Sequence, residues 1–199
     1  MNFKILFLSS LLSLVSLTSL NAQWTQLANY PGEARNHPIC FAIDNYGYVT
    51  TGLTNQFSVL SDFMRYDITT DTWETLANFP GDVRGLGVGT QLDGIGYIGF
   101  GVNGSGPLND LWKYDPSTET WTELASCPCD GRRHPAFVAL KGKIYVGLGD
   151  NGAANLKDWW EYDIATDTWT EKTDFPGIQR HHPYYFAIGD YAYVGMGHG

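Results

Sequence analysis

The sequence predicts an all-β protein that repeats one structural unit along the chain. The first observation is a period, because Trp24, Trp73, Trp121 and Trp169 recur at a nearly constant interval of about 48 residues. The second is composition, since 15% aromatic residues and 23 glycines favour short strands and tight turns over helices. The third is that no segment keeps the apolar period of about 3.6 residues that an amphipathic helix needs. We therefore expect repeated sheets and almost no helix.

Three more residue types recur in register with the tryptophans. An Arg, a Tyr and a Gly follow each Trp in that order, and each stands at the same distance from it in all four cases. Columns in register over this length indicate four repeats, at about residues 24–72, 73–120, 121–168 and, in part, 169–199. The Arg column is Arg35, Arg84, Arg132 and Arg180, the Tyr column is Tyr48, Tyr97, Tyr145 and Tyr193, and the Gly column is Gly52, Gly101, Gly149 and Gly197.

Residues 1–22 lie outside the repeats and have the composition of a secretory signal peptide. One cation, Lys4, precedes a run rich in Leu, Ser and Val, and Leu20-Asn21-Ala22 has the small residue of a cleavage site. Ser and Thr interrupt the run too often for a segment that spans a bilayer. We expect cleavage after Ala22, no membrane insertion afterwards, and a mature chain, 23–199, that is secreted, periplasmic or on the cell surface.

Each repeat has the pattern of a four-stranded antiparallel meander, with strands that we call A to D. In the first repeat, alternating residues at 39–43 and 46–50 flank the turn Asp44-Asn45, which predicts a β-hairpin. In the second, residues 110–114 and 120–124 predict strands C and D, joined by a Pro-Ser-Thr turn. At the two ends of the repeats, we expect a single D strand at Trp24 to Leu27 and an A–B hairpin in the fourth repeat.

A meander of about 48 residues has two apolar faces, so it must stack on copies of itself, and radial stacking of such sheets gives a β-propeller. The sequence resembles the kelch-repeat family in the Tyr-Val-Gly-Leu-Gly at 145–149, the Tyr-Asp of strand C and the Trp six residues beyond that Asp. This resemblance covers residues 24–199 and implies a kelch-type β-propeller of four-stranded blades. The glycines after strand B depart from the kelch pattern, because they are spaced or single rather than adjacent.

The resemblance also implies a blade count. Kelch propellers usually have about six or seven blades, whereas this sequence supplies three whole repeats, an A–B hairpin and one D strand. We therefore expect an incomplete arc of about three and a half blades, truncated at the C-terminus.

The order of the strands predicts one face that carries the variable loops. The D–A and B–C connections share this face, and the D–A loops hold the Arg column, followed two residues later by a His in three repeats and by Leu86 in the second. The Arg column has two interpretations: a brace that donates to carbonyls of a neighbouring loop, or a ring of cations for a carboxylate or polyhydroxyl ligand. The expected ligand-binding residues are Arg35, His37, Arg84, Asn103, Arg132, His134, Asp150, Asn151, Arg180 and His182.

The cysteines and histidines do not predict a metal site. Cys127 and Cys129 lie in one loop, as thiols or as a local disulfide, and Cys40 is expected to be a buried thiol in a strand. Zinc needs four ligands, and we expect equivalent positions round a propeller channel to lie too far apart for three histidines to share an ion. We therefore expect no metal and no cofactor.

The residues favour a binding module over an enzyme. A formal net charge of −9 at pH 7 would repel nucleic acid and anionic membranes, and no Ser-His-Asp order, paired-carboxylate motif or phosphate loop is visible. The first interpretation is a non-catalytic module for a glycan or protein ligand. The resemblance extends at fold level to sialic acid mutarotases and galactose-oxidase-like copper enzymes, so a cofactor-free sugar mutarotase or epimerase, a galactose-oxidase-like fragment and a structural repeat without a ligand stay open. The sequence indicates no oligomeric state.

Overall fold

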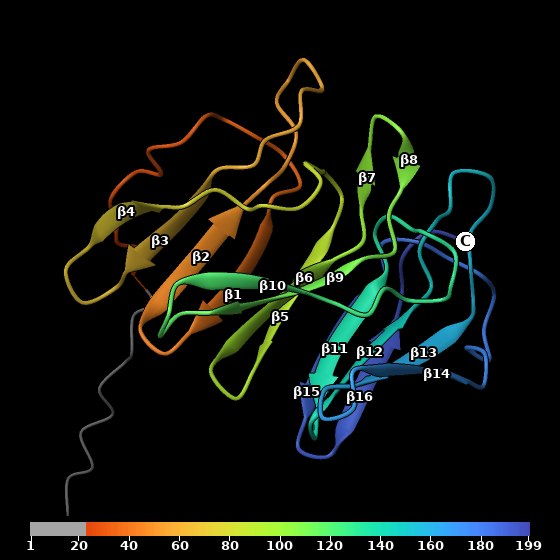
Figure 1. Ribbon diagram of the computed structural model, residues 1–199. Coiled ribbons are helices and arrows are strands. Elements are labelled where there is room, and N and C mark those ends of the chain that lie inside the picture. The colour runs from red at the N-terminus through yellow and green to blue at the C-terminus, as the bar shows by residue number, and fades with distance from the viewer. Residues whose placement is uncertain (1–22) are drawn as a thin grey trace, which may run out of the picture.

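The computed structural model describes residues 23–199, and its strands form a series of antiparallel sheets (Figure 1). The expected signal peptide, residues 1–22, lies outside the described residues. Three sheets have four long strands each, a fourth has two, and no helix occurs within residues 23–199. We call the three four-stranded sheets blades 1 to 3 and the sheet at the end of the chain the final hairpin. These sheets confirm the expected all-β fold.

The strands of each blade follow the order of the meander. Blade 1 contains β1 (Ile39–Ile43), β2 (Tyr46–Thr50), β3 (Phe63–Asp67) and β4 (Thr72–Leu76). Blade 2 contains β5 (Val88–Leu92), β6 (Ile95–Gly99), β9 (Leu111–Asp115) and β10 (Thr120–Leu124), with a short hairpin, β7 (Val102–Asn103) and β8 (Gly106–Pro107), between its second and third strands. Blade 3 contains β11 (Ala136–Leu140), β12 (Lys143–Gly147), β13 (Trp159–Asp163) and β14 (Thr168–Lys172), and the final hairpin contains β15 (Tyr184–Ile188) and β16 (Tyr191–Gly195).

The A strands lie at the inner edge of an arc. β1, β5, β11 and β15 contact one another in turn, so successive blades fan outward from these four strands (Figure 1). The turn from strand A to strand B needs a left-handed residue, and it has one in every repeat: Asp44, Asp93, Lys141 and Gly189 have φ between 51° and 55°. The hairpin turns therefore form where the sequence predicts them.

Neighbouring blades pack face to face through apolar side chains. Ile39 and Phe41 of β1 are 1% and 7% exposed and belong to the core between blades 1 and 2. On the facing strand, Gly89 leaves the necessary room, because a Cβ there would lie 2.6 Å from Cγ2 of Ile39. On the final hairpin, the residues at the positions of this face are 53% to 70% exposed: Tyr184, Phe186 and Ile188.

Two expectations about the first repeat are wrong. Trp24 to Leu27 is not a strand, because no strand among the described residues lies beside it to supply hydrogen bonds. Cys40 is exposed rather than buried, since the alternate residues of β1 point toward blade 2 and Cys40 points away from it. Cys127 and Cys129 form a disulfide, with their Cα atoms 5.1 Å apart.

Two hydrogen bonds recur in blades 1 and 3, one from the Tyr of strand C to the C–D turn and one from the Trp column to a backbone carbonyl. In blade 3 the Tyr162 hydroxyl donates to Oδ1 of Asp167 at 2.6 Å, and Nε1 of Trp169 donates to the carbonyl of Ala125 at 2.7 Å. Blade 1 makes the same pair of bonds. Blade 2 has Glu119 at the equivalent position, and there the buried Tyr114 hydroxyl and Trp121 Nε1 have no partner among residues 23–199.

Candidate functional site

The loops that connect the blades gather at one end of the strands, which we call the loop face. It consists of the B–C loops, residues 51–62, 100–110 and 148–158, and the D–A segments, residues 28–38, 77–87, 125–135 and 173–183. Figure 1 shows the three B–C loops projecting on the same side of the arc. Within a repeat, isolated bridges such as Arg133 with Asp150 join the D–A loop to the B–C loop.

The Arg column binds the loops of the protein itself. In blade 3, the buried Arg132 donates from Nε to the carbonyl of Asp130 at 3.0 Å and from Nη1 to the carbonyl of Leu148 at 3.1 Å. Its two terminal nitrogens also bind both oxygens of Asp158, at 2.8 and 2.7 Å. Such a bidentate, charge-assisted pair is among the stronger side-chain contacts in proteins. The same contacts join Arg84 to Asp110 and Arg35 to Asp62.

These contacts are those of the brace interpretation. Arg84 and Arg132 have no exposed surface, and the Arg35 side chain is only 4% exposed. Arg180 also donates to two carbonyls, those of Ile178 and Met196, but it has no carboxylate partner in the described part of the chain. Within residues 23–199, the Arg column therefore does not form a ring of solvent-exposed cations.

A backbone bond links the glycine after strand B of each blade, which we call the closing glycine, to the Arg of the next repeat. The N–H of Gly101 donates to the carbonyl of Arg132 at 2.8 Å, and those of Gly52 and Gly149 make the equivalent bonds to Arg84 and Arg180. Gly101 has φ 92°, which strongly favours glycine. We call this bond the Gly–Arg latch. It connects the Gly and Arg columns between blades, a role that neither column shows in sequence alone.

The polar residues expected to select a ligand hold their own loops. Oδ1 of Asn103 accepts the N–H groups of Ser105 and Gly106, and Oδ1 of Asn151 accepts those of Ala153 and Ala154. Asp150 accepts from the N–H of Gly152 and from Nε of Arg133. These side chains therefore stabilise the turns of the second and third B–C loops. The loops present their tips to solvent instead, as with Phe57, which is 81% exposed.

All five histidines of the chain lie close together, four of them on the loop face and His198 beside it. The ring centroids of His134 and His182 are 3.3 Å apart, and those of His37 and His134 are 5.0 Å apart. One ring nitrogen from each of these three lies within 4.8 Å of the other two. His181 and His198 lie beside them, with centroids 5.0 and 5.8 Å from that of His182. The expectation that equivalent histidines would be too far apart is therefore wrong.

Main-chain hydrogen bonds explain the proximity of His134 and His182. His134 donates its N–H to the carbonyl of Leu86 at 3.0 Å, and His182 donates to the carbonyl of His134 at 3.2 Å. The steps from the second repeat to the third and from the third to the fourth are thus single main-chain hydrogen bonds at this level. His37, His134 and His182 also share the left-handed conformation, with φ of 49° to 51°, which few residues other than glycine adopt.

The environment of His134 keeps its ring neutral. Burial lowers its pKa to about 3, with a further contribution from the neighbouring histidines. Burial also lowers the pKa of His182. Both ring nitrogens of His134 are buried without a hydrogen-bond partner among residues 23–199, an arrangement that is rare for buried polar atoms.

Comparison with known proteins agrees with this architecture. A family model described as Kelch motif matches residues 101–128, which include β9 and β10. The chain folds as a partial kelch-type β-propeller. Among solved structures, "Structure of YjhT" matches with a TM-score of 0.72 and 20% identity over 82% of this chain, which shows the fold alone. The chain spans 59% of the length of that structure. No curated protein matches the sequence.

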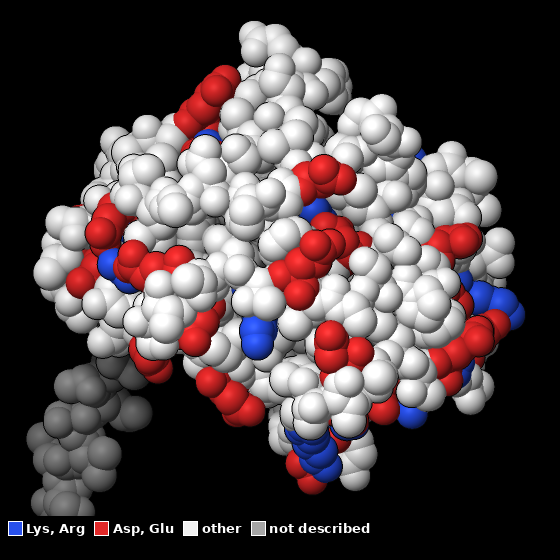
Figure 2. All heavy atoms as spheres, in the orientation of Figure 1, with Lys and Arg blue, Asp and Glu red and all other residues white. Residues whose placement is uncertain are grey.

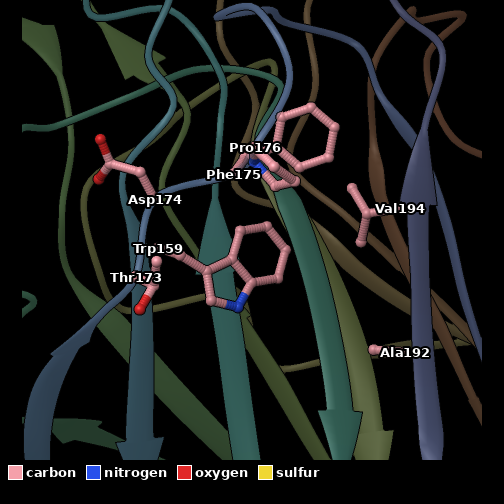
Figure 3. Close-up of a pocket in the computed structure, with 7 residues that line it drawn as sticks. All are labelled: Trp159, Thr173, Asp174, Phe175, Pro176, Ala192 and Val194. Atoms are coloured by element: carbon pink, nitrogen blue, oxygen red, sulfur yellow. The ribbon is translucent and has the colours of Figure 1, made fainter.

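A groove lies between blade 3 and the final hairpin, and no histidine lines it. Figure 3 shows Trp159 of blade 3 across from Ala192 and Val194 of β16, with Phe175 and Pro176 above them. The groove has a volume of about 310 Å³ and one titratable residue in its lining, Asp174, which pairs with Lys157. A single paired carboxylate supplies no acid and base for catalysis.

Acidic side chains are spread over the surface of the kelch arc. Figure 2 shows Asp and Glu scattered over the visible face, with fewer Lys and Arg among them. Several of the cations are paired, as Lys143 is with Asp163. No helix within residues 23–199 is long and apolar enough to cross a membrane.

Sequence reasoning missed two parts of the site. The carboxylates Asp62, Asp110 and Asp158 stand at a nearly constant distance after the Arg of their repeat, so they form a column just before strand C that could have been found by its register. His181 and His198 occur in the fourth repeat only, and no periodic signal distinguishes them.

Proposed function

We propose that the chain is an exported, non-catalytic binding module whose loop face binds a glycan or protein ligand. The observation that carries this proposal is that the contacts that hold the blades together repeat, whereas the loops on one side do not. Buried Arg–Asp pairs and the Gly–Arg latch repeat in every complete blade, whereas the B–C loops differ in sequence and project on one side. Variable loops on a rigid scaffold are the usual design of a binding surface.

The exposed groups on the loop face suit a ligand with apolar faces and hydroxyl groups. Phe57 is 81% exposed and is held in a left-handed conformation with φ 61°, its N–H donating to the carbonyl of Thr54 at 2.9 Å. A bulky residue in that conformation is strained, and such strain concentrates at functional positions. An aromatic ring presented in this way can stack on a sugar ring or an apolar side chain.

The buried arginines limit the ligand class. Because Arg84 and Arg132 are paired and inaccessible, an acidic ligand would have to be recognised by other groups. The proposal therefore favours neutral glycans or protein segments over polyanions, in keeping with the net charge of −9.

The test is a binding screen with a matched pair of variants. Wild-type protein is screened on a glycan array and against extracellular proteins, and each hit is repeated with Phe57→Ala and with Ile68→Ala. Ile68 is a fair control because it is 62% exposed but lies in the C–D turn, at the opposite end of the strands. We expect loss of binding of about 10-fold or more for Phe57→Ala only, as for an aromatic residue at the centre of an interface.

Other results would count against the proposal. Equal loss of binding in both variants would place the ligand away from the loop face. Accelerated exchange of sialic acid anomers, followed by NMR, would favour a mutarotase instead.

A further inference from the structure

We propose that His37, His134 and His182 together bind one divalent transition-metal ion, of which Zn²⁺ is the best fit. The proposal goes beyond the binding module and does not rest on it. Three imidazoles with a fourth position left open form a familiar zinc site, with Zn–N distances of about 2.0–2.1 Å. Nitrogens at those distances in a tetrahedral site are about 3.3 Å apart, so side-chain rotation has to shorten separations that now reach 4.8 Å.

The unpartnered nitrogens of His134 are the second observation that points to a ligand. Buried polar atoms nearly always have a partner, yet neither ring nitrogen of His134 has one within residues 23–199. A metal ion would satisfy one of them. The second repeat shows that the loop does not require the ring, because Leu86 occupies the same position with φ 61°.

The surroundings of the histidines also favour metal binding. Nδ1 of His37 lies 2.9 Å from Oδ1 of Asn36, which can only accept, so Nδ1 carries the proton and Nε2 is left to bind. The nearby Arg133 is paired with Asp150, at 3.0 Å, which reduces its repulsion of a cation.

The backbone holds two of the three ligands in place before an ion arrives. The main-chain bonds from His182 to His134 and from His134 to Leu86 fix the Cα positions of two of them, at the inner edge of the arc. His37 and His182 are exposed, so an ion and water can reach the site from the loop face. A site with three imidazole nitrogens suits Zn²⁺, Cu²⁺ or Ni²⁺ over Mg²⁺ or Ca²⁺, which prefer oxygen ligands.

The experiment titrates metal-free protein, residues 23–199, with ZnCl₂ in competition with a chromophoric chelator, and repeats the titration with Mg²⁺. We expect one Zn²⁺ per chain and no competition by Mg²⁺. Substituting His134→Leu, which copies the second repeat, should weaken Zn²⁺ binding by at least about 100-fold, since even outer partners of metal ligands matter by about 10- to 100-fold. Asn36→Ala should weaken it by about 10-fold for the same reason.

The control is His198→Ala, which removes a histidine of the same cluster that lies outside the three. It should leave the affinity within about threefold. His134→Leu should also keep its thermal stability without metal, because it removes two unpaired buried nitrogens, and His37→Leu provides an exposed alternative if it does not fold. Absence of stoichiometric binding, or binding that survives both His134→Leu and His37→Leu, would overturn the proposal. Neither result would affect the ligand test that uses Phe57.

Discussion

Replacing Glu119 by Asp should stabilise the protein, because blade 2 lacks a bond that blades 1 and 3 make. In those blades an Asp in the C–D turn accepts from the Tyr hydroxyl of strand C. Glu119 points instead to Arg65, at 3.2 Å, and leaves the Tyr114 hydroxyl and Trp121 Nε1 buried without partners. A shorter side chain at this position would place its carboxylate as the other two blades do.

The magnitude follows from the groups involved. A buried polar group without a partner costs about 1–3 kcal/mol, and Glu119→Asp pairs the Tyr114 hydroxyl directly. The Asp carboxylate would also hold the backbone of Ala77, the equivalent of Ala125, whose carbonyl accepts from the Trp in blade 3. The lost contact with Arg65 is an exposed ion pair, which contributes about 0–1 kcal/mol. We therefore expect a net gain of about 1–3 kcal/mol in the free energy of unfolding.

The assay is urea unfolding followed by tryptophan fluorescence, with thermal unfolding beside it. The urea midpoint should rise with an unchanged slope, and Tm should rise by roughly 2–4 °C per kcal/mol for a domain of this size. The reverse change in blade 3, Asp167→Glu, is the matched control and should lower stability by a similar amount. A neutral or destabilising Glu119→Asp, or an equal gain from Glu119→Ala, would refute the reasoning.

Three more predictions follow from the braces, the latch and the N-terminus. Asp158→Asn should destabilise by about 3–5 kcal/mol at pH 7, because it leaves the buried Arg132 without its counter-charge. Burial alone would raise the pKa of Asp158, but Arg132 outweighs it and holds that pKa below its usual range. This stabilisation is therefore present above about pH 4 and is lost as the pH falls through the folded pKa. If the urea midpoints of Asp158→Asn ran parallel to those of the wild type over the whole pH series, this reasoning would be contradicted. Gly101→Ala should cost about 1–3 kcal/mol, since φ is 92° and its Cβ would lie 2.7 Å from the N of Gly87, whereas Gly104→Ala, with nothing within 4 Å, should be neutral in the same denaturation assay. Sequencing of exported protein should begin at Gln23, and an intact Met1 in a membrane fraction would show an anchor instead.

The repeat could be predicted from sequence because the same physical demand recurs in every blade. The A–B turns need left-handed residues, and Asp44 and Lys141 stand where the register puts them. The chain leaving strand B of each repeat needs a glycine with positive φ, which the Gly column supplies. Such local requirements leave a periodic trace, and so the blades could be placed from sequence alone.

The parts that could not be predicted depend on contacts between repeats or on what lies next to a segment. Trp24 to Leu27 has the pattern of a D strand, but a strand forms only beside another strand. The histidines were expected to be far apart because the spacing of loops round an arc is a property of the assembled blades. The brace contacts of Arg132 could not be assigned from sequence, because its partner Asp158 lies in another loop.

The Gly–Arg latch has a direction, and that direction affects how the nascent chain can fold. The N–H of each closing glycine donates to the carbonyl of the arginine in the following repeat, so each of these bonds joins a blade to the repeat that comes next in the chain. As the polypeptide emerges N-terminus first, blade 1 is secured when the segment around Arg84 appears, and blade 2 when that around Arg132 does. Because each of these bonds closes less than one repeat of chain, assembly can proceed in step with synthesis or translocation, without waiting for distant segments.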